Sequence, residues 1–165
     1  MTRFVWIFGP TAVGKETLIY AIASNPNLKL TSDLGLTSPI VVQKDAMVQR
    51  HAERDPLEAK ISADRDRGAT VLIKGQGHDI EQRTIFKLEA LLPDDEFLYL
   101  FLDAPPDVIR QRREQRGTPG PGWDDAYDRA VNLGMVGELE AEGISFRWFD
   151  TSRGDAVEVA SPPAN

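Results

Sequence analysis

The chain has 165 residues, 41% of them hydrophobic, a size and composition that predict a single domain with its own hydrophobic core. It contains no cysteine and two histidines, which excludes a disulfide framework, a thiolate nucleophile and a histidine-rich metal site. The formal net charge of -7 disfavours a broad nucleic-acid surface, because proteins that bind duplexes neutralise the phosphates with a basic face.

The first apolar run, residues 4–8, is too short for a membrane span or for the core of a signal peptide. We therefore expect a cytoplasmic protein that has no membrane partner. The domain is expected to cover residues 1–160, and the tail at 161–165 to be frayed.

Strands and helices are predicted to alternate along the chain. Short apolar runs rich in β-branched and aromatic residues predict strands at 3–8, 39–44, 70–74, 97–103 and 144–150. Segments of helical composition separate them or follow them, at 15–24, 46–67, 79–92, 106–116 and 124–142. Residues 24–39 are expected to form a long loop and 117–123 a mobile one. This order predicts an α/β fold, with a five-stranded parallel sheet sandwiched between helices.

The sequence FGPTAVGKET, residues 8–17, lies between the first predicted strand and the first predicted helix. From Gly9 to Lys15 it matches the pattern G-x-x-x-x-G-K. There the glycines let backbone N–H groups face phosphate oxygens, while the helix N-terminus and the lysine supply positive charge. A strand-to-helix turn that merely uses glycine is the alternative. Because strand, helix and lysine occur together, the sequence favours a phosphate site. Glu16 stands where the pattern has Ser or Thr.

On this motif the chain resembles the P-loop kinases, in particular the nucleoside-monophosphate-kinase-like group that includes adenylate, shikimate and gluconate kinases. Several of these have a non-hydroxyl residue after the lysine and then a threonine, as in GKET here. The resemblance implies a P-loop NTPase fold with a short lid, and ATP and Mg²⁺ as cofactors. It implies that Lys15 contacts the β- and γ-phosphates, that Thr17 contacts the α-phosphate, and that ATP is bound by Gly9, Pro10, Thr11, Ala12, Val13, Gly14, Lys15, Glu16 and Thr17.

Glu16 and Thr17 are the candidate metal-binding residues that follow from the resemblance. Glu16 would reach Mg²⁺ directly or through water; alternatively, its charge would repel phosphate and lower the affinity for ATP. Lys74 stands where many relatives have an acidic residue that orients magnesium.

A second segment, residues 102–117 (LDAPPDVIRQRREQRG), resembles the entrance to the lid of these kinases, and the lid is expected at about 112–130. Arg112 and Arg116 are four residues apart, so they share one helix face and can both point at the transferred phosphoryl group. We expect both to be catalytic and Arg112 also to bind ATP. The alternative is a solvated basic face, on which Arg110 and Arg113 are expected to be ordinary surface residues.

The acceptor side is assigned by resemblance as well. Asp45 follows the second predicted strand, where related kinases bind or deprotonate the acceptor hydroxyl; a helix N-cap is an equally good interpretation. Gly75, Gln76 and Arg83, in and after the segment KGQGHD, are expected to contact the acceptor. The segment FDTSRGD, residues 149–155, resembles the loop that packs against adenine.

The sequence thus predicts an enzyme, an ATP-dependent phosphotransferase that moves the γ-phosphoryl group to a small-molecule hydroxyl or a nucleoside monophosphate. One alternative is a nucleotide-binding module with little or no turnover, which Glu16 and Lys74 favour. The other is a nucleic-acid-modifying P-loop enzyme, such as a polynucleotide 5'-hydroxyl kinase or a tRNA prenyltransferase. The net negative charge of the chain disfavours nucleic acid as a partner.

Overall fold

The computed structural model describes residues 3–25, 27–36, 39–42, 70–75, 89–90 and 93–162. Its strands form one six-stranded sheet in the order β2-β3-β1-β4-β5-β6. The strands are β1 (Arg3–Phe8), β2 (Pro39–Val42), β3 (Thr70–Lys74), β4 (Glu96–Asp103), β5 (Arg147–Asp150) and β6 (Val157–Val159). Neighbours from β2 to β5 are parallel, and β6 is antiparallel to β5. The predicted α/β fold is confirmed, and β6 adds an antiparallel edge strand to the five predicted strands.

The described helices are α1 (Lys15–Ser24), α2 (Lys29–Asp33), α7 (Pro106–Arg116) and α8 (Asp125–Ala141). The bounds of α1 and α7 are those predicted, and α8 is one residue shorter at each end. The prediction of a long loop over 24–39 was wrong where α2 forms. Leu34 and Leu36 are buried beside this helix and Leu30 packs against the same cluster, so tertiary packing stabilises a short helix that has no periodic pattern.

Other predicted bounds are confirmed only in part. The predicted helix 46–67 lies outside the described residues, and of the predicted helix 79–92 the structure describes only residues 89–90, which are helical. Strand β5 begins at Arg147, three residues later than predicted. The two apolar residues that misled the prediction, Ile144 and Phe146, are buried in the core just before the strand.

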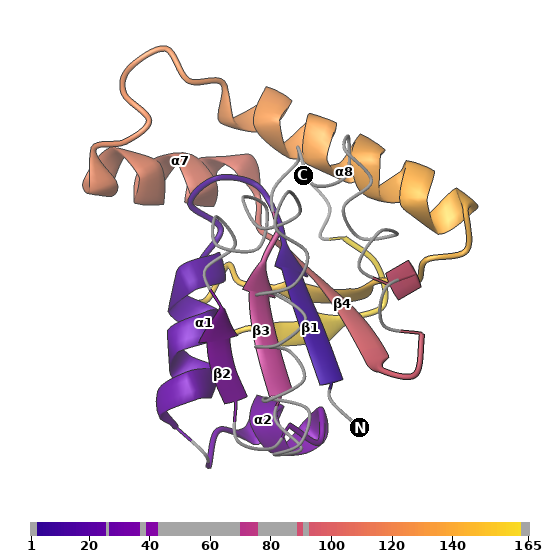
Figure 1. Cartoon of the computed structure of the whole chain (residues 1–165). Coiled ribbons are helices and arrows are strands. Elements are labelled where there is room, and N and C mark those ends of the chain that lie inside the picture. Colours follow the sequence, from indigo (N-terminus) through magenta and orange to yellow (C-terminus); the bar gives the residue numbers. More distant parts are fainter. Residues whose placement is uncertain are drawn as a thin grey trace, which may run out of the picture.

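Both faces of the sheet are covered by helices (Figure 1). Successive side chains of β1 point to opposite faces, as the two-residue period of a strand requires. Phe4, Trp6 and Phe8 pack in one cluster with Val136 and Leu139 of α8. The other cluster joins side chains of β1, α1 and α7, namely Val5, Ile7, Leu18, Ile19, Ile22 and Ile109. Strand β1 is therefore buried on both sides, which explains its continuous apolar sequence.

Strand β1 lies between β3 and β4 in the middle of the sheet. Ligands of open α/β sheets bind outside the carboxyl ends of the strands, where the strand order reverses. The G-x-x-x-x-G-K loop follows β1 at this position, and α7 and the beginning of α8 lie near it (Figure 1). Among the described helices, none is long and apolar enough to cross a membrane.

Candidate functional site

The loop between β1 and α1 has the tight backbone that its glycines predict. Gly9 has a φ of 150°, and a Cβ there would lie 2.4 Å from the carbonyl oxygen of Leu102 and 2.8 Å from Cγ1 of Val13. Gly14 caps α1 in the left-handed region with a φ of 108°, and Ala12 also has a positive φ, 63°. The loop thus wraps closely over the end of β4 and enters α1 through a left-handed residue, which glycine adopts without steric cost.

Lys15, the first residue of α1, folds back over this loop. Its Nζ donates to the carbonyl oxygens of Gly9, at 2.6 Å, and Pro10, at 3.0 Å. The pKa of Lys15 is lowered to about 8, mainly by burial; the charges of Lys74 and Arg116 contribute to the lowering, and those of Asp128 and Glu16 partly oppose it. An anionic ligand would stabilise this buried ammonium, because it would offset the loss of hydration that lowers the pKa.

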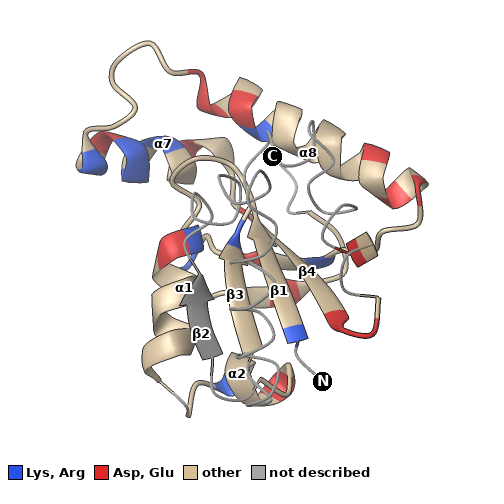
Figure 2. Cartoon of the chain, in the orientation of Figure 1, with Lys and Arg blue, Asp and Glu red and all other residues tan. Residues whose placement is uncertain are grey.

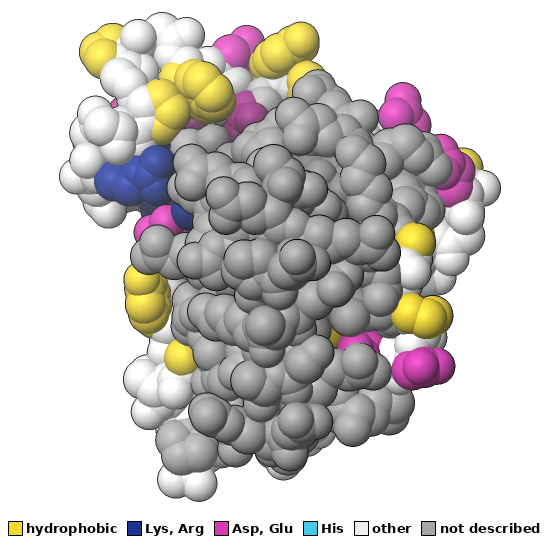
Figure 3. All heavy atoms as spheres, viewed as in Figure 1, with side chains coloured by type: hydrophobic (Ala, Val, Ile, Leu, Met, Phe, Trp, Pro, Cys, Tyr) yellow, Lys and Arg dark blue, Asp and Glu magenta, His cyan; other side chains and the backbone are white. Residues whose placement is uncertain are grey.

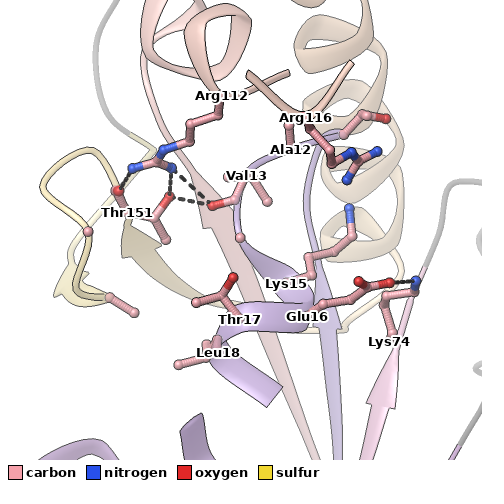
Figure 4. Close-up of a pocket in the computed structure, with 14 residues that line it drawn as sticks. Ala12, Val13, Lys15, Glu16, Thr17, Leu18, Lys74, Arg112, Arg116 and Thr151 are labelled. Carbon is pink, nitrogen blue, oxygen red and sulfur yellow. Dashed lines mark hydrogen bonds and ion pairs between the residues drawn. The ribbon is translucent and has the colours of Figure 1, made fainter. Parts of the chain in front are cut away.

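A cavity of about 680 Å³ opens beside this lysine (Figure 4). Its lining includes four cationic side chains and one carboxylate, those of Lys15, Lys74, Arg112, Arg116 and Glu16. The chain as a whole has a net charge of -7, so positive charge is concentrated here against the overall balance. Figure 2 shows basic residues along α7, and Figure 3 shows Lys and Arg side chains gathered at that edge of the molecule. The cavity therefore suits an anionic ligand.

Arg112 and Arg116 both line the cavity from α7, as their spacing predicted. Arg112 donates to the carbonyl oxygen of Val13 at 3.3 Å and to Oγ1 of Thr151 at 3.2 Å, and it also donates to the carbonyl oxygen of Thr151. It thus links the loop after β1 to the loop after β5. Arg116 is exposed and donates from Nε to the carbonyl oxygen of Thr118 at 2.9 Å. In Figure 4 its guanidinium lies on the same side as the Lys15 ammonium.

The neighbouring Arg113 is not the surface residue that the sequence predicted. It is 6% exposed, and its Nε donates to both carboxylate oxygens of Asp125, at 2.9 and 3.0 Å. It also donates to the carbonyl oxygen of Pro119 at 3.2 Å. Arg113 therefore ties α7, the following loop and α8 together. Arg110 is exposed, as expected.

Glu16 and Lys74 form an ion pair at the edge of the cavity, with 2.5 Å between Oε1 and Nζ. The hydrogen bond and charge of Lys74 lower the pKa of the Glu16 carboxyl below its usual range. Mg²⁺ takes oxygen ligands such as carboxylates, but this carboxylate already holds an ammonium. The described residues also include no group of three His, Cys, Asp or Glu that could hold a metal ion. The Glu16 carboxylate is thus occupied by an ammonium in this arrangement, and the metal roles of Glu16 and Thr17 stay predictions.

Two residues near the loop after β1, Thr151 and Asp128, were not named individually from the sequence. Thr151 lines the cavity, and its hydroxyl donates to the carbonyl oxygen of Val13 at 2.7 Å. It directly follows β5 and lies within segment 149–155, which was assigned to adenine as a whole from the sequence, without a role for this residue. Asp128 of α8 accepts from the backbone N–H of Thr11 at 2.8 Å. These partners are 117 positions apart, and no local pattern signals their contact.

Most of the residues predicted to bind the acceptor lie outside the part of the chain that the structure describes. Asp45, Gln76 and Arg83 lie outside the described residues. Gly75 is described, and a Cβ there would lie 2.3 Å from Cε1 of Phe8. The close approach that this glycine permits is therefore to the Phe8 ring, and its contact with an acceptor stays a prediction. Gly154 and Ala156 line the cavity in or next to segment 149–155, where adenine was expected.

No protein-family model matches the chain, and no curated protein matches it. Solved structures do. A sugar kinase from Janibacter sp. HTCC2649, solved unliganded, is 21% identical with a TM-score of 0.53, covering 94% of this chain and 88% of that one. A proposed kinase from Chloroflexus aurantiacus j-10-fl is 18% identical with a TM-score of 0.52, covering 92% and 86%. This chain shares its α/β fold with these two kinases. A gluconokinase from Sinorhizobium meliloti 1021 is also similar, at 15% identity and a TM-score of 0.43, covering 88% and 81%.

The lowered pKa of Lys15 leads to a pH prediction for ATP binding. Phosphate oxygens favour the ammonium, so bound ATP would raise the pKa of Lys15, and above about pH 8 binding would require the uptake of a proton. The affinity for ATP is then expected to be highest below about pH 8. It should fall as the pH rises through that value, by about tenfold between pH 7 and pH 9. Titration calorimetry at a series of pH values measures it. Lys15→Arg, whose guanidinium stays charged, should give a flatter profile; a flat profile in the parent would contradict the prediction.

Proposed function

We propose that this protein transfers the γ-phosphoryl group of ATP to a small-molecule acceptor. The observation that carries the proposal is the cationic cavity built on the G-x-x-x-x-G-K loop, in which Lys15, Arg112 and Arg116 approach one space from two helices. The kinase fold is consistent with it. The acceptor would enter near the carboxyl ends of β1 and β3, since ligands of such sheets bind there.

In this proposal the protein acts by positioning and by neutralising charge. Phosphoryl transfer requires little covalent chemistry from the enzyme, because the attacking and leaving oxygens need only be held in line and the charge on the phosphoryl oxygens stabilised. Backbone N–H groups of the loop would bind the phosphate chain. Lys15 would contact the β- and γ-phosphates, and Arg116 would stabilise the charge of the transferred group. Asp45 stays the predicted residue for the acceptor hydroxyl, and magnesium use stays a prediction.

A nucleotide-binding module with little turnover is the second candidate function. The Glu16–Lys74 ion pair favours it, since the only carboxylate among the described cavity residues is bound to an ammonium. Such a protein would bind ATP through the same loop and cations. It would not transfer the γ-phosphoryl group to any acceptor.

Two measurements on the same protein separate these functions. A thermal-shift screen with ATP and a panel of sugars, hydroxy acids and nucleoside monophosphates identifies acceptors, because a ligand that binds the folded state raises the melting temperature. Mass spectrometry then tests whether ADP and a phosphorylated acceptor form together in equal amounts. Binding of ATP without a phosphorylated product across the panel supports the module, and failure to bind ATP contradicts both.

The arginines of α7 give a prediction with an internal control. We expect Arg116→Ala to lower turnover by about a hundredfold with little loss of stability, because a cation on the transferring group acts mainly in the transition state, whereas an exposed arginine adds little to folding. Arg112→Ala should also lower stability, since Arg112 bridges Val13 and Thr151. Arg110→Ala, exposed on the same helix, should change neither turnover nor melting temperature. Full activity of Arg116→Ala would assign that residue to the solvated surface.

A further inference from the structure

Lys74 lies where a second cation could reach a bound phosphate chain. It is the last residue of β3, and it is in register with Ile7 of β1, two residues before Gly9. Its side chain lines the same cavity as Lys15. The two lysines are close enough for the charge of Lys74 to lower the pKa of Lys15. Any polyanion bound at Lys15 would therefore also be close to Lys74.

Glu16 holds Lys74 at the edge of this cavity with a weak contact. The side chains are 63% and 33% exposed, respectively. Ion pairs with such exposure contribute little net free energy, and a phosphate chain offers the ammonium more acceptor oxygens and more negative charge than one carboxylate does. A lysine also has a flexible four-carbon stem that can redirect its ammonium. Lys74 can thus leave Glu16 when a stronger anion enters.

The charge balance of the cavity fits an anion that brings no metal. Four cationic side chains and one carboxylate line it, so the described lining carries a surplus of three positive charges. Before the nucleotide arrives, a magnesium ion on Glu16 would lie next to the Lys74 ammonium, 2.5 Å from the same carboxylate oxygen, where like charges repel. In this site, lysine ammonium groups therefore stand where a protein-bound metal ion would otherwise neutralise the phosphate charge.

We propose that Lys74 is a phosphate-binding residue of this site, released by Glu16 when the nucleotide arrives, and that it lets the protein bind ATP without a divalent cation. The inference rests on the proposed function, because it concerns the same nucleotide. It assigns opposite effects to the two members of one ion pair: Lys74 binds phosphate, and Glu16 competes with phosphate for Lys74.

The test is ATP binding by titration calorimetry, once in EDTA and once in excess Mg²⁺. We expect the parent to bind ATP in EDTA with an affinity within about fivefold of that in Mg²⁺. Lys74→Ala should lose about tenfold or more in EDTA, the equivalent of one charge-assisted contact. Glu16→Gln should bind ATP in EDTA as tightly as the parent or more tightly, because it removes a competing anion.

The chain supplies a matched control. Lys29 and Asp33 of α2 form an exposed ion pair, also at 2.5 Å, that does not line the cavity, and Lys29→Ala should leave both affinities unchanged. A parent that binds ATP only with Mg²⁺ would overturn the inference and leave the proposed function standing. So would a loss in Glu16→Gln as large as that in Lys74→Ala, since a structural pair gives the same sign at both ends. A parent that binds no ATP in either buffer contradicts the proposed function itself.

Discussion

Lys15→Ala is expected to weaken ATP binding by about tenfold to a hundredfold, the equivalent of a lost charge-assisted hydrogen bond. Turnover at saturating ATP should fall by about a further hundredfold or more, because charge on the transferred group also loses its main cation. The thermal stability of the variant, by contrast, should not decrease. Burial lowers the pKa of Lys15, which means that the folded protein holds the ammonium at a cost at neutral pH. Removing it should leave the melting temperature at least as high as in the parent.

Lys15→Met refines this test, because it keeps an unbranched apolar stem of similar length and removes only the charge. We expect it to lose ATP affinity and turnover as Lys15→Ala does, with a melting temperature equal or higher. Calorimetry, a coupled ADP assay and thermal unfolding on both variants measure the three quantities. Normal ATP affinity in Lys15→Met would show that the loop after β1 does not bind the phosphates, whatever the stability.

Local features of this site could be predicted from the sequence because their causes are local. The glycines at 9 and 14 and the lysine at 15 specify a turn and a helix start within seven residues. The four-residue spacing of Arg112 and Arg116 places both on one face of α7. These predictions require only the geometry of one turn or one helix, and the structure confirms that both arginines line the cavity.

The pairing of charges across the fold could not be predicted in this way. Helical spacing places Arg113 on a different side of α7 from Arg112, but whether that side meets water or another helix depends on where α8 lies. The structure places α8 against it, so Arg113 is buried with Asp125. Glu16 and Lys74 are 58 positions apart and are brought together only because β3 pairs with β1. Taken alone, each residue is only a departure from the pattern of the kinases that the sequence resembles. Taken together, the two form an ion pair.

Strand β6 was missed for a similar reason. It has three residues, Val157–Val159, of which two are exposed and the last is half-buried, so it lacks the apolar run of a buried strand. Its place depends on backbone pairing with β5 and on the contact of Glu158 with Arg147, two hydrogen bonds of 2.8 and 2.7 Å. Edge strands of this kind leave little signal in hydrophobic periodicity.

The largest effect on stability is expected at the buried ion pair that anchors α8 to the sheet. Asp103, at the end of β4, is 0% exposed and accepts from Arg129 of α8 at 2.8 and 2.6 Å. The residue before Arg129 is Asp128, which accepts from the N–H of Thr11, so this anchor also positions α8 against the loop after β1.

We expect Arg129→Met to lower the free energy of unfolding by about 3–5 kcal/mol, because it leaves the Asp103 carboxylate buried without its guanidinium. The double variant Asp103→Leu with Arg129→Met should recover much of this loss, since apolar side chains can replace a buried pair at little net cost. Glu158→Gln, which breaks the exposed pair with Arg147, is the matched control and should cost at most about 1 kcal/mol. Denaturant unfolding with an unchanged m-value measures all three. If Arg129→Met and Glu158→Gln lower the free energy of unfolding equally, burial does not set the strength of these ion pairs. In that case α8 is held to the sheet mainly by its apolar contacts with β1 and β4.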